Sequence, residues 1–512
     1  MSFSFNFSRP GLLLSQLLIL LICSCQSNQS YQEQYRPQFH FSPPAHWMND
    51  PNGLVFYEGE YHLFYQYFPD STVWGPMHWG HAVSNDMVNW KNLPVALYPD
   101  SLGYIFSGSA VIDWKNTSGL QTGRYPPMIA IYTQHSEEKL KLGRNDFQVQ
   151  SIAYSNNKGR TFNKYVLNPV IKNPGERDFR DPKVRWDEHF RKWILVFAAG
   201  QKVKFYSSPN LLNWEYLSEF GIGEGAHGGV WECPDIFPLK IMNEEKWVLL
   251  VSINPGAPNG GSGTQYFIGN FDGTKFTNDN PDSTIMWLDW GPDNYAGVTW
   301  SDITEKDGRR IYIGWMSNWT YAQSVPTEAW RSAMTIPRML ELKNTGSGIR
   351  LFSSPVNEMV KLRKSESKLD LLDDSSFNIS GLNELIFKVD LKNSSADSFG
   401  AIFSNSKHES LVFGFDKLHN QLFIDRTKSG KISFSKEFPG RHFAPRISND
   451  SILEIRLFLD YSSLELFADG GSVTMTEIFY PNEKINKVMF FRKNGIARIE
   501  NAELFDLSTI WN

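Results

Sequence analysis

A unit of short apolar strands recurs along the first two thirds of the chain, and no long helical periodicity interrupts it. Each unit begins with two apolar runs; the five pairs are 54–56 with 61–67, 109–113 with 128–133, 183–186 with 193–198, 236–239 with 247–253, and 298–301 with 311–316. A further strand then leads into a turn that ends in an aromatic residue, as at 82–90, 153–162, 205–214 and 268–276. Four-stranded units spaced by roughly 50–70 residues are typical of propeller blades, whereas a sandwich with long insertions recurs less regularly. The repeat therefore predicts an all-β fold that begins with a five-bladed β-propeller.

The pattern changes near residues 343–348, which read Lys-Asn-Thr-Gly-Ser-Gly. Later strands lack the propeller unit, and Leu453, Ile455, Leu457 and Leu459 alternate with polar residues. Such alternation predicts strands with one buried face, and hence a β-sandwich. We expect a propeller at 39–342, a linker at 343–364 and a sandwich at 365–512. The sandwich could bind glycan or cover a propeller edge, and its sequence favours neither role.

The first 25 residues resemble an export signal. Residues 12–22 are almost wholly apolar, too few to span a bilayer, and follow Arg9. The run ends Ile22-Cys23-Ser24-Cys25, which resembles a bacterial lipobox with Cys25 as the lipidated residue; an ordinary secretory signal is the alternative. We expect residues 26–38 to form a flexible polar tether. The exported protein would then face the periplasm or cell surface, held at the membrane only through Cys25.

Composition excludes several classes of protein. A length of 512 residues with 41% hydrophobic content suffices for two domains with buried cores. The net charge of −5, with both signs mixed, gives no sign of a nucleic-acid partner. Beyond the signal only Cys233 remains, so no disulfide framework is expected and Cys233 should be a small buried residue. No cofactor is expected, and the oligomeric state stays open.

Three acidic residues stand just before the first strand of a unit. Asp50 precedes the first unit, Asp181 the third and Glu232 the fourth, and a proline follows each acid or its neighbour. The first strand of a propeller blade is innermost, so equivalent positions on different blades converge on one funnel. Three converging carboxylates without matched cations repel one another. A purely structural role for all three is therefore disfavoured.

Carboxylates that converge among aromatic residues suit the cleavage of a glycosidic bond. One acid protonates the leaving oxygen while another carboxylate faces the developing oxocarbenium ion. A metal site is the competing use of clustered acids. The neighbouring residues are Trp, Phe, Asn and Gln rather than further carboxylates, so no metal is expected.

The motifs around these acids resemble glycoside hydrolase family 32, which holds invertases, inulinases, levanases and related β-fructosidases. The three main motifs are Trp47-Met48-Asn49-Asp50-Pro51-Asn52-Gly53, Arg180-Asp181-Pro182 and Trp231-Glu232-Cys233-Pro234-Asp235. Further matches are Tyr61-His62-Leu63-Phe64-Tyr65-Gln66, Trp79-Gly80-His81-Ala82-Val83-Ser84, Phe106-Ser107-Gly108-Ser109 and Ile313-Gly314-Trp315-Met316. The likeness covers essentially the whole chain after the signal. It also implies a five-bladed propeller followed by a β-sandwich.

The resemblance implies a role for each acid: Asp50 is the nucleophile, Glu232 the general acid/base and Asp181 the transition-state stabiliser. A retaining mechanism of this kind needs nucleophile and acid/base carboxyls about 5–5.5 Å apart. The charge of Asp50 should keep Glu232 protonated until Asp50 is esterified, after which Glu232 can activate water. Hydrogen bonds from the sugar hydroxyls to Asp181 would strengthen as positive charge develops.

The resemblance also implies sugar-binding residues, namely Asn49, Gln66, Trp74, Phe106, Ser107 and Trp315. Arg180 is expected to orient the sugar or to keep Asp181 ionised. The stretches 263–269 and 330–334 look more like microbial exo-acting fructan hydrolases than plant invertases. We therefore expect release of fructose from levan or inulin, and also from sucrose. The alternatives are endo action, transfer of the fructosyl group to an acceptor other than water, and a non-catalytic fructan-binding propeller.

Overall fold

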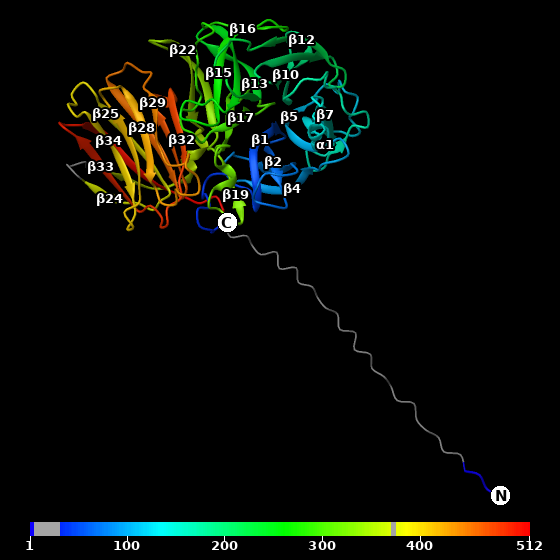
Figure 1. The fold of residues 1–512 in the computed structure, drawn as a ribbon, viewed down its shortest axis with the longest axis horizontal. Helices are drawn as coiled ribbons and strands as arrows, with labels where there is room; N and C mark the ends of the chain where they lie inside the picture. The colour runs from blue at the N-terminus through cyan, green and yellow to red at the C-terminus, as the bar shows by residue number, and fades with distance from the viewer. Residues whose placement is uncertain (5–30, 370–374, 512) are drawn as a thin grey trace.

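The computed structural model describes residues 1–4, 31–369 and 375–511, which form two β-domains (Figure 1). Most of the predicted export signal, Cys25 included, and residues 26–30 of the predicted tether lie outside the described residues. No helix in the described ranges combines the length and the apolar character needed to cross a membrane.

The amino-terminal domain is a ring of five antiparallel sheets, counted over the described residues, which confirms the predicted propeller. The innermost strand of each blade comes first in the chain. Blade by blade, the strands are β1 (His46–Tyr57), β2 (Glu60–Phe68), β3 (His78–Ser84) and β4 (Lys91–Leu97); β5 (Tyr104–Ile112), β6 (Met128–His135), β7 (Gln148–Ser155) and β8 (Asn163–Lys164); β9 (Phe179–Asp187), β10 (Lys192–Ala199), β11 (Val203–Ser208) and β12 (Glu215–Phe220); β13 (Val230–Ile241), β14 (Glu244–Asn254), β15 (Gly263–Phe271) and β16 (Phe276–Asn278); and β17 (Tyr295–Thr299), β18 (Arg310–Met316), β21 (Arg338–Thr345) and β22 (Gly348–Pro355). A short helix, α1 (Glu137–Lys141), follows β6.

Every innermost strand carries a register shift at the same level of the ring. At each shift, two residues of the inner strand face one residue of the next strand, which is a β-bulge. The bulged pairs are Asn49-Asp50, Phe106-Ser107, Asp181-Pro182, Cys233-Pro234 and Ala296-Gly297. The predicted acids therefore lie within the innermost strands, at or beside a bulge, rather than before them. Because a bulge bends its strand and redirects side chains, it sets where these residues point.

The ring is closed by contacts between its first and last blades. The short strand β19 (Trp330–Arg331) pairs in parallel with the start of β1, with His46 opposite Trp330. Further along β1, the N–H of Phe56 donates to the carbonyl of Ser301 at 3.0 Å. Two short elements flank this region, η1 (Ala322–Ser324) and β20 (Ala333–Met334), the latter pairing with β18. Closure of the ring leaves only short, protected strand edges facing the central channel.

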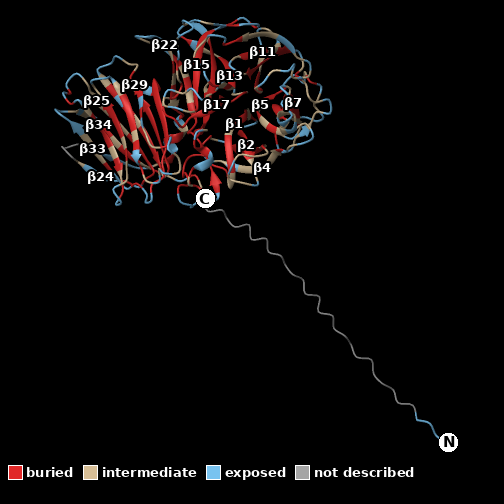
Figure 2. Cartoon of the chain, viewed as in Figure 1, coloured by how far each residue is buried: buried red, intermediate tan, exposed pale blue. Residues whose placement is uncertain are grey.

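The carboxy-terminal domain is a sandwich of two antiparallel sheets, which confirms the second predicted fold. The first sheet, in order, holds β23 (Arg363–Lys368), β34 (Arg498–Leu507), β25 (Asn383–Asp390), β30 (Ile452–Asp460), β31 (Ser463–Ala468) and β32 (Val473–Ile478). The second holds β24 (Ser376–Asn378), β33 (Lys487–Lys493), β26 (Ser398–Ser404), β27 (Ser410–Asp416), β28 (Gln421–Lys428) and β29 (Arg441–Pro445). The 3-10 turns η2 (Asn357–Leu362) and η3 (Asp469–Gly471) complete the elements. Figure 2 shows buried residues along the strands of both domains.

Buried charges join the two domains. Arg338 of β21 is fully buried, donates to Asp289 at 2.8 Å and pairs with Glu465 of β31. Glu465 also contacts Nε2 of His40 at 2.8 Å, and the other ring nitrogen of His40 lies 2.8 Å from Asp460. Such pairs hold their geometry because an unpaired charge is costly to bury.

The predicted tether at 26–38 is wrong for its described part. Tyr35, Arg36 and Gln38 are buried, and Arg36 donates to the carbonyl of Pro43 at 2.7 Å. The backbone N–H of Gln38 donates to Asp460 of the sandwich at 2.9 Å. These polar groups are satisfied inside the fold, so the segment is ordered despite its hydrophilic composition.

The predicted linker at 343–364 is also wrong. Residues 338–345 and 348–355 form β21 and β22, the outer two strands of the fifth blade, and Gly346-Ser347 is the tight connection between them. The propeller therefore ends at Pro355 rather than at 342. A short η2 and the first sandwich strand, β23, follow almost directly. A turn inside a hairpin and a loop between domains share the same Gly, Ser and Asn residues, so composition does not separate them.

Candidate active site

One end of the propeller ring opens into a cavity of about 510 Å³. Residues from several blades line it, and they include all three predicted acids. The predicted site residues on its wall are Asn49, Asp50, Gln66, Trp74, Phe106, Ser107, Arg180, Asp181 and Glu232. These side chains come from the bulged inner strands β1, β5, β9 and β13, from β2, and from the loop after β2.

Asp50 is held by donors from its own strand and the next blade. Asn49 Nδ2 donates to Oδ1 at 2.9 Å, and Ser107 Oγ on β5 donates to Oδ2 at 2.7 Å. Burial and the nearby charge of Glu232 raise the pKa of Asp50, while these donors lower it. The carboxylate is thus fixed in orientation by hydrogen bonds on both oxygens.

Asp181 is a buried carboxylate at the bulge of β9, with a left-handed φ of 66°. Its Oδ2 accepts the backbone N–H of Cys233 at 3.0 Å, and Arg180 Nε lies 3.8 Å from the same oxygen. Burial raises the pKa of Asp181 to about 7; Arg180 opposes the rise, and the charges of Glu232 and Asp50 add to it. The negative charges of neighbouring acids in this cavity therefore oppose the ionisation of Asp181.

Glu232 is held by two donors on opposite sides. Arg180 donates to Oε1 through Nε at 3.1 Å and Nη2 at 2.9 Å, and the hydroxyl of Tyr295 donates to Oε2. Arg180 also donates to Asp178 at 2.6 Å. Burial opposes the charge of Arg180, but Glu232, Asp181 and Asp178 together hold its pKa above the ordinary value. Asp50 and Glu232 thus meet different partners, as two carboxylates with different roles require.

The remaining predicted residues form polar and apolar parts of the wall. Asn49 Oδ1 accepts the indole N–H of Trp47 at 2.7 Å, which fixes the amide. Nε2 of the buried Gln66 has no hydrogen-bond partner among the described residues, so this amide can donate to a ligand. Trp74 and Phe106 meet edge to face, with ring centroids 6.1 Å apart, and give the cavity an aromatic side.

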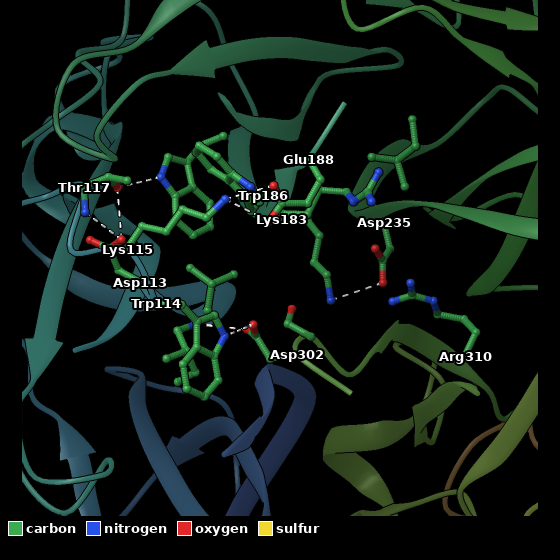
Figure 3. A pocket seen from close by; sticks show the side chains of 16 residues that line it. Asp113, Trp114, Lys115, Thr117, Lys183, Trp186, Glu188, Asp235, Asp302 and Arg310 are labelled. Carbon is green, nitrogen blue, oxygen red and sulfur yellow. Dashed lines mark hydrogen bonds and ion pairs between the residues drawn. The ribbon is translucent and has the colours of Figure 1, made fainter. Parts of the chain in front are cut away.

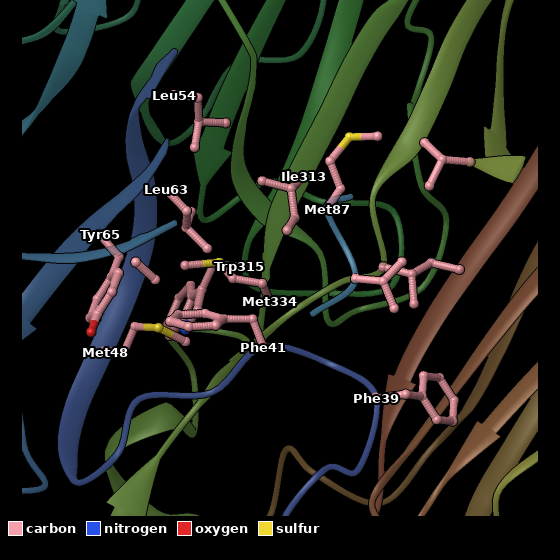
Figure 4. Close-up of a cluster of buried hydrophobic side chains, with 14 of the residues drawn as sticks. Phe39, Phe41, Met48, Leu54, Leu63, Tyr65, Met87, Ile313, Trp315 and Met334 are labelled. Atoms are coloured by element: carbon pink, nitrogen blue, oxygen red, sulfur yellow. The ribbon is translucent and has the colours of Figure 1, made fainter. Parts of the chain in front are cut away.

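Trp315 does not lie on the cavity wall, which corrects the expectation of direct sugar contact. Its side chain is fully buried and packs against Trp47 and Trp319, with centroids 6.2 Å and 4.9 Å away. Figure 4 shows it inside the apolar cluster with Met48 and Met334. Trp319 lines the cavity instead. The inward position of Trp315 depends on packing between blades, which a motif does not specify.

Sequence reasoning missed Tyr295 and several residues of the wall. Tyr295 does not line the cavity but donates to Glu232; it begins β17, and a strand expected only from 298 left it out. The others surround the opening: His135, Glu137, Leu140, Phe147, Gln148, Arg177, Asp178, Trp319 and Gln323. Arg177 and Asp178 lie three and two residues before Arg180, which is a signal that could have found them. The rest come from α1, η1, the ends of β6 and β7, and loops, whose positions only the closed ring defines.

An all-β ring with carboxylates in one aromatic cavity defines an enzyme that acts on a glycosidic bond. Residues 40–355 match the Glycosyl hydrolases family 32 N-terminal domain, and residues 355–511 match the C-terminal domain of that family. The protein belongs to glycosyl hydrolases family 32.

Known proteins resemble the chain over nearly its whole length. A levanase of Bacillus subtilis (strain 168) is 48% identical, over 97% of this chain and 74% of the relative. An extracellular exo-inulinase of Aspergillus awamori is 38% identical, over 94% of this chain and 96% of the relative. The crystal structure of exo-inulinase from Aspergillus awamori superposes with a TM-score of 0.87 at 35% identity and covers 94% of this chain and 100% of that one. A β-fructofuranosidase of Schwanniomyces occidentalis complexed with fructosyl-erythritol gives 0.84 at 31% identity, with 94% and 99% covered.

Proposed function

We propose that the protein is a retaining β-fructosidase that releases fructose from levan or inulin chains and from sucrose. The observation that carries this proposal is the pairing of Asp50 and Glu232 in one cavity with different partners. Asp50 is held by Asn49 and Ser107, and Glu232 by Arg180 and Tyr295. One carboxylate can therefore attack while the other transfers protons.

In the first step Asp50 attacks C2 of the fructosyl unit. The bond from C2 to the leaving oxygen breaks, and Glu232 gives its proton to that oxygen. In the second step Glu232 takes a proton from water, the water oxygen bonds to C2, and the ester to Asp50 breaks. Asp181 accepts hydrogen bonds from the ring hydroxyls, and these bonds strengthen as C2 gains positive charge.

The relatives support the substrate class. They carry the names levanase, exo-inulinase and, for a Schizosaccharomyces pombe protein 34% identical, invertase. We propose exo action on the same substrates. A non-catalytic fructan-binding propeller is not favoured, because binding alone gains nothing from three mutually repelling acids.

Digestion of levan, inulin and sucrose followed by product chromatography tests the proposal. Free fructose from the first time points onward is expected from all three. A ladder of oligosaccharides from levan would exclude exo action, and products longer than the substrate would indicate transfer instead of hydrolysis. Tight binding without fructose release would favour the binding module.

We further propose that the protein is exported and anchored through Cys25. Relatives named as extracellular support export, and the lipobox-like motif supports the anchor. In a bacterial host, Cys25→Ala should move the protein from the membrane fraction to the soluble fraction. Retention of the Cys25→Ala variant in the membrane fraction would contradict lipid anchoring.

A further inference from the structure

A second cavity lies further along the same inner strands, toward their carboxyl ends (Figure 3). On β9, Asp181 borders the catalytic cavity, whereas Lys183 and Arg185 border the second one. Lys183 and Arg185 are alternate residues, so they share a face of β9. The four residue steps from Asp181 to Arg185 span about 13 Å along the strand. The two cavities share no lining residue, so the second is a separate site.

The second cavity has the size and walls of a sugar site. Its volume is about 260 Å³, enough for one ring sugar. Trp114, Trp186 and Trp193 contribute to its wall. Trp114 is 53% exposed yet held firmly, because its Nε1 donates to Asp302 at 2.8 Å and its ring meets Tyr57 edge to face at 5.5 Å. A rigid, exposed indole is a flat surface on which the apolar face of a sugar can stack.

The charged residues of this cavity balance. Four cations and four carboxylates line it, so the formal charge is zero: Lys115, Lys183, Arg185 and Arg310 against Asp113, Asp235, Asp302 and Glu188. A cavity of zero net charge favours neither a cation nor an anion. Figure 3 shows that Lys183, Asp235 and Arg310 lie close together in this cavity.

Several of these groups lack full hydrogen bonding. Asp235 is 1% exposed; its Oδ2 accepts two bonds from Thr299 at 2.7 Å, but its Oδ1 has no partner in the described chain. Nη1 of Arg185 is likewise buried without a hydrogen bond, although it forms an ion pair with Oδ2 of Asp187 at 3.5 Å. Arg310 donates to the carbonyl of Trp300 at 3.3 Å, and its guanidinium lies over the ring of Phe237, 4.9 Å from the centroid. Within the described residues, it has no carboxylate within 4.0 Å. Both free acceptors and free donors are present.

A ligand that both donates and accepts hydrogen bonds fits these walls better than an ion. We propose that the second cavity binds one neutral ring sugar, stacked on Trp114 and hydrogen-bonded to Asp235, Arg185 and Arg310. Sugar hydroxyls act as donor and acceptor together, and so can bridge a carboxylate and a guanidinium. Such a site would hold the enzyme on a saccharide without occupying the catalytic cavity. This second sugar site is additional to the proposed function. The proposed function is used only to choose fructose as the probe.

Isothermal titration calorimetry with fructose and with glucose tests the site. Asp50→Asn provides a background without turnover. Two fructose sites are expected in Asp50→Asn, and one in the double variant Asp50→Asn with Trp114→Ala. The control is Asp50→Asn with Tyr216→Ala, which removes another exposed aromatic and should keep both sites. Arg310→Gln should weaken the second site at least ten-fold. A single site in Asp50→Asn, or two sites that persist after Trp114→Ala, would overturn the proposal.

Sucrose turnover separates this proposal from the proposed function. Trp114→Ala in the otherwise unchanged enzyme should keep normal kcat and KM. If the unchanged enzyme does not split sucrose while the Trp114-dependent sugar site is present, the proposed function fails and the second site stands.

Discussion

The backbone N–H of Cys233 donates a 3.0 Å hydrogen bond to Oδ2 of Asp181, which ties the fourth blade directly to the acid of the third. The thiol of Cys233 also lies 3.6 Å from Oδ2 of Asp50 on the first blade. Cys233 has a φ of 45° inside its bulge. One buried residue thus contacts acids from two other blades, so the spacing of the acids depends on how the ring closes.

Loss of either principal carboxylate should abolish turnover without unfolding the protein. Asp50→Ala and Glu232→Ala should each lower kcat on sucrose by several orders of magnitude, because one removes the proposed nucleophile and the other the proposed proton donor. A good leaving group or azide should partly restore Glu232→Ala. A better leaving group should not restore Asp50→Ala. Near-normal turnover in either variant would contradict the assignment.

The hydroxyl of Ser107 should tune the pH profile. Ser107→Ala removes the 2.7 Å hydrogen bond to Asp50, so the already raised pKa of Asp50 should rise further. A hydrogen bond to a charged group contributes about 1.5–3 kcal/mol, which corresponds to about one to two pH units. Asp50 must be ionised to attack, so the acid limb of kcat/KM should move to higher pH. Ser107→Thr, which keeps a hydroxyl, is the control; an unmoved limb in Ser107→Ala would exclude this role.

Tyr295 should position the acid/base carboxyl. Tyr295→Phe removes the hydroxyl that donates to Glu232 while keeping the buried ring. We expect kcat to fall by about 10-fold to 100-fold with little change in KM, because the lost bond orients a group that moves protons. Tyr312→Phe loses a hydroxyl bonded to Asn294 outside the cavity and should leave kcat unchanged. Equal effects of the two substitutions would show that Tyr295 acts only through packing.

Arg338 should stabilise the junction of the two domains. Arg338→Met would leave Asp289 as a buried carboxylate without its cation and Glu465 with His40 alone. Removing one partner of a buried ion pair costs about 3–5 kcal/mol. Urea unfolding should show this loss, whereas Arg441→Met, which breaks an exposed pair with Asp425, should cost less than about 1 kcal/mol. Similar losses in both variants would contradict the role of burial.

His40 should make stability depend on pH. Burial lowers the pKa of His40, but hydrogen bonds to Asp460 and Glu465 outweigh this and raise it to about 9. A raised pKa in the folded state means that this contribution is complete below about 6.5 and is lost as pH rises through about 9. The free energy of unfolding should therefore fall by about 3 kcal/mol at most across that range. His40→Gln should remove this part of the pH dependence; an unchanged slope would exclude His40 as its source.

Much of the fold could be predicted because each blade is a local unit. Paired apolar runs at 54–67 and 183–198, for example, became β1 with β2 and β9 with β10. Turn residues inside a hairpin misled the prediction at 343–348, because Gly, Ser and Asn serve a hairpin and a linker equally. The burial of Arg36 could not be predicted, since it depends on the carbonyls of Pro43 and Pro44, which come into place only on folding, as well as on nearby Glu33.

The sequence by itself determined the class of the fold, the family and the three acids carried by the inner strands. Those features depend on local periodicity and on motifs, which a chain carries without folding. Only the tertiary structure decided that Trp315 lies behind Trp319, that Tyr295 reaches Glu232 and that Cys233 joins Asp181 to Asp50. These contacts join residues far apart in the chain, and they form only when the bulged strands of a closed ring meet.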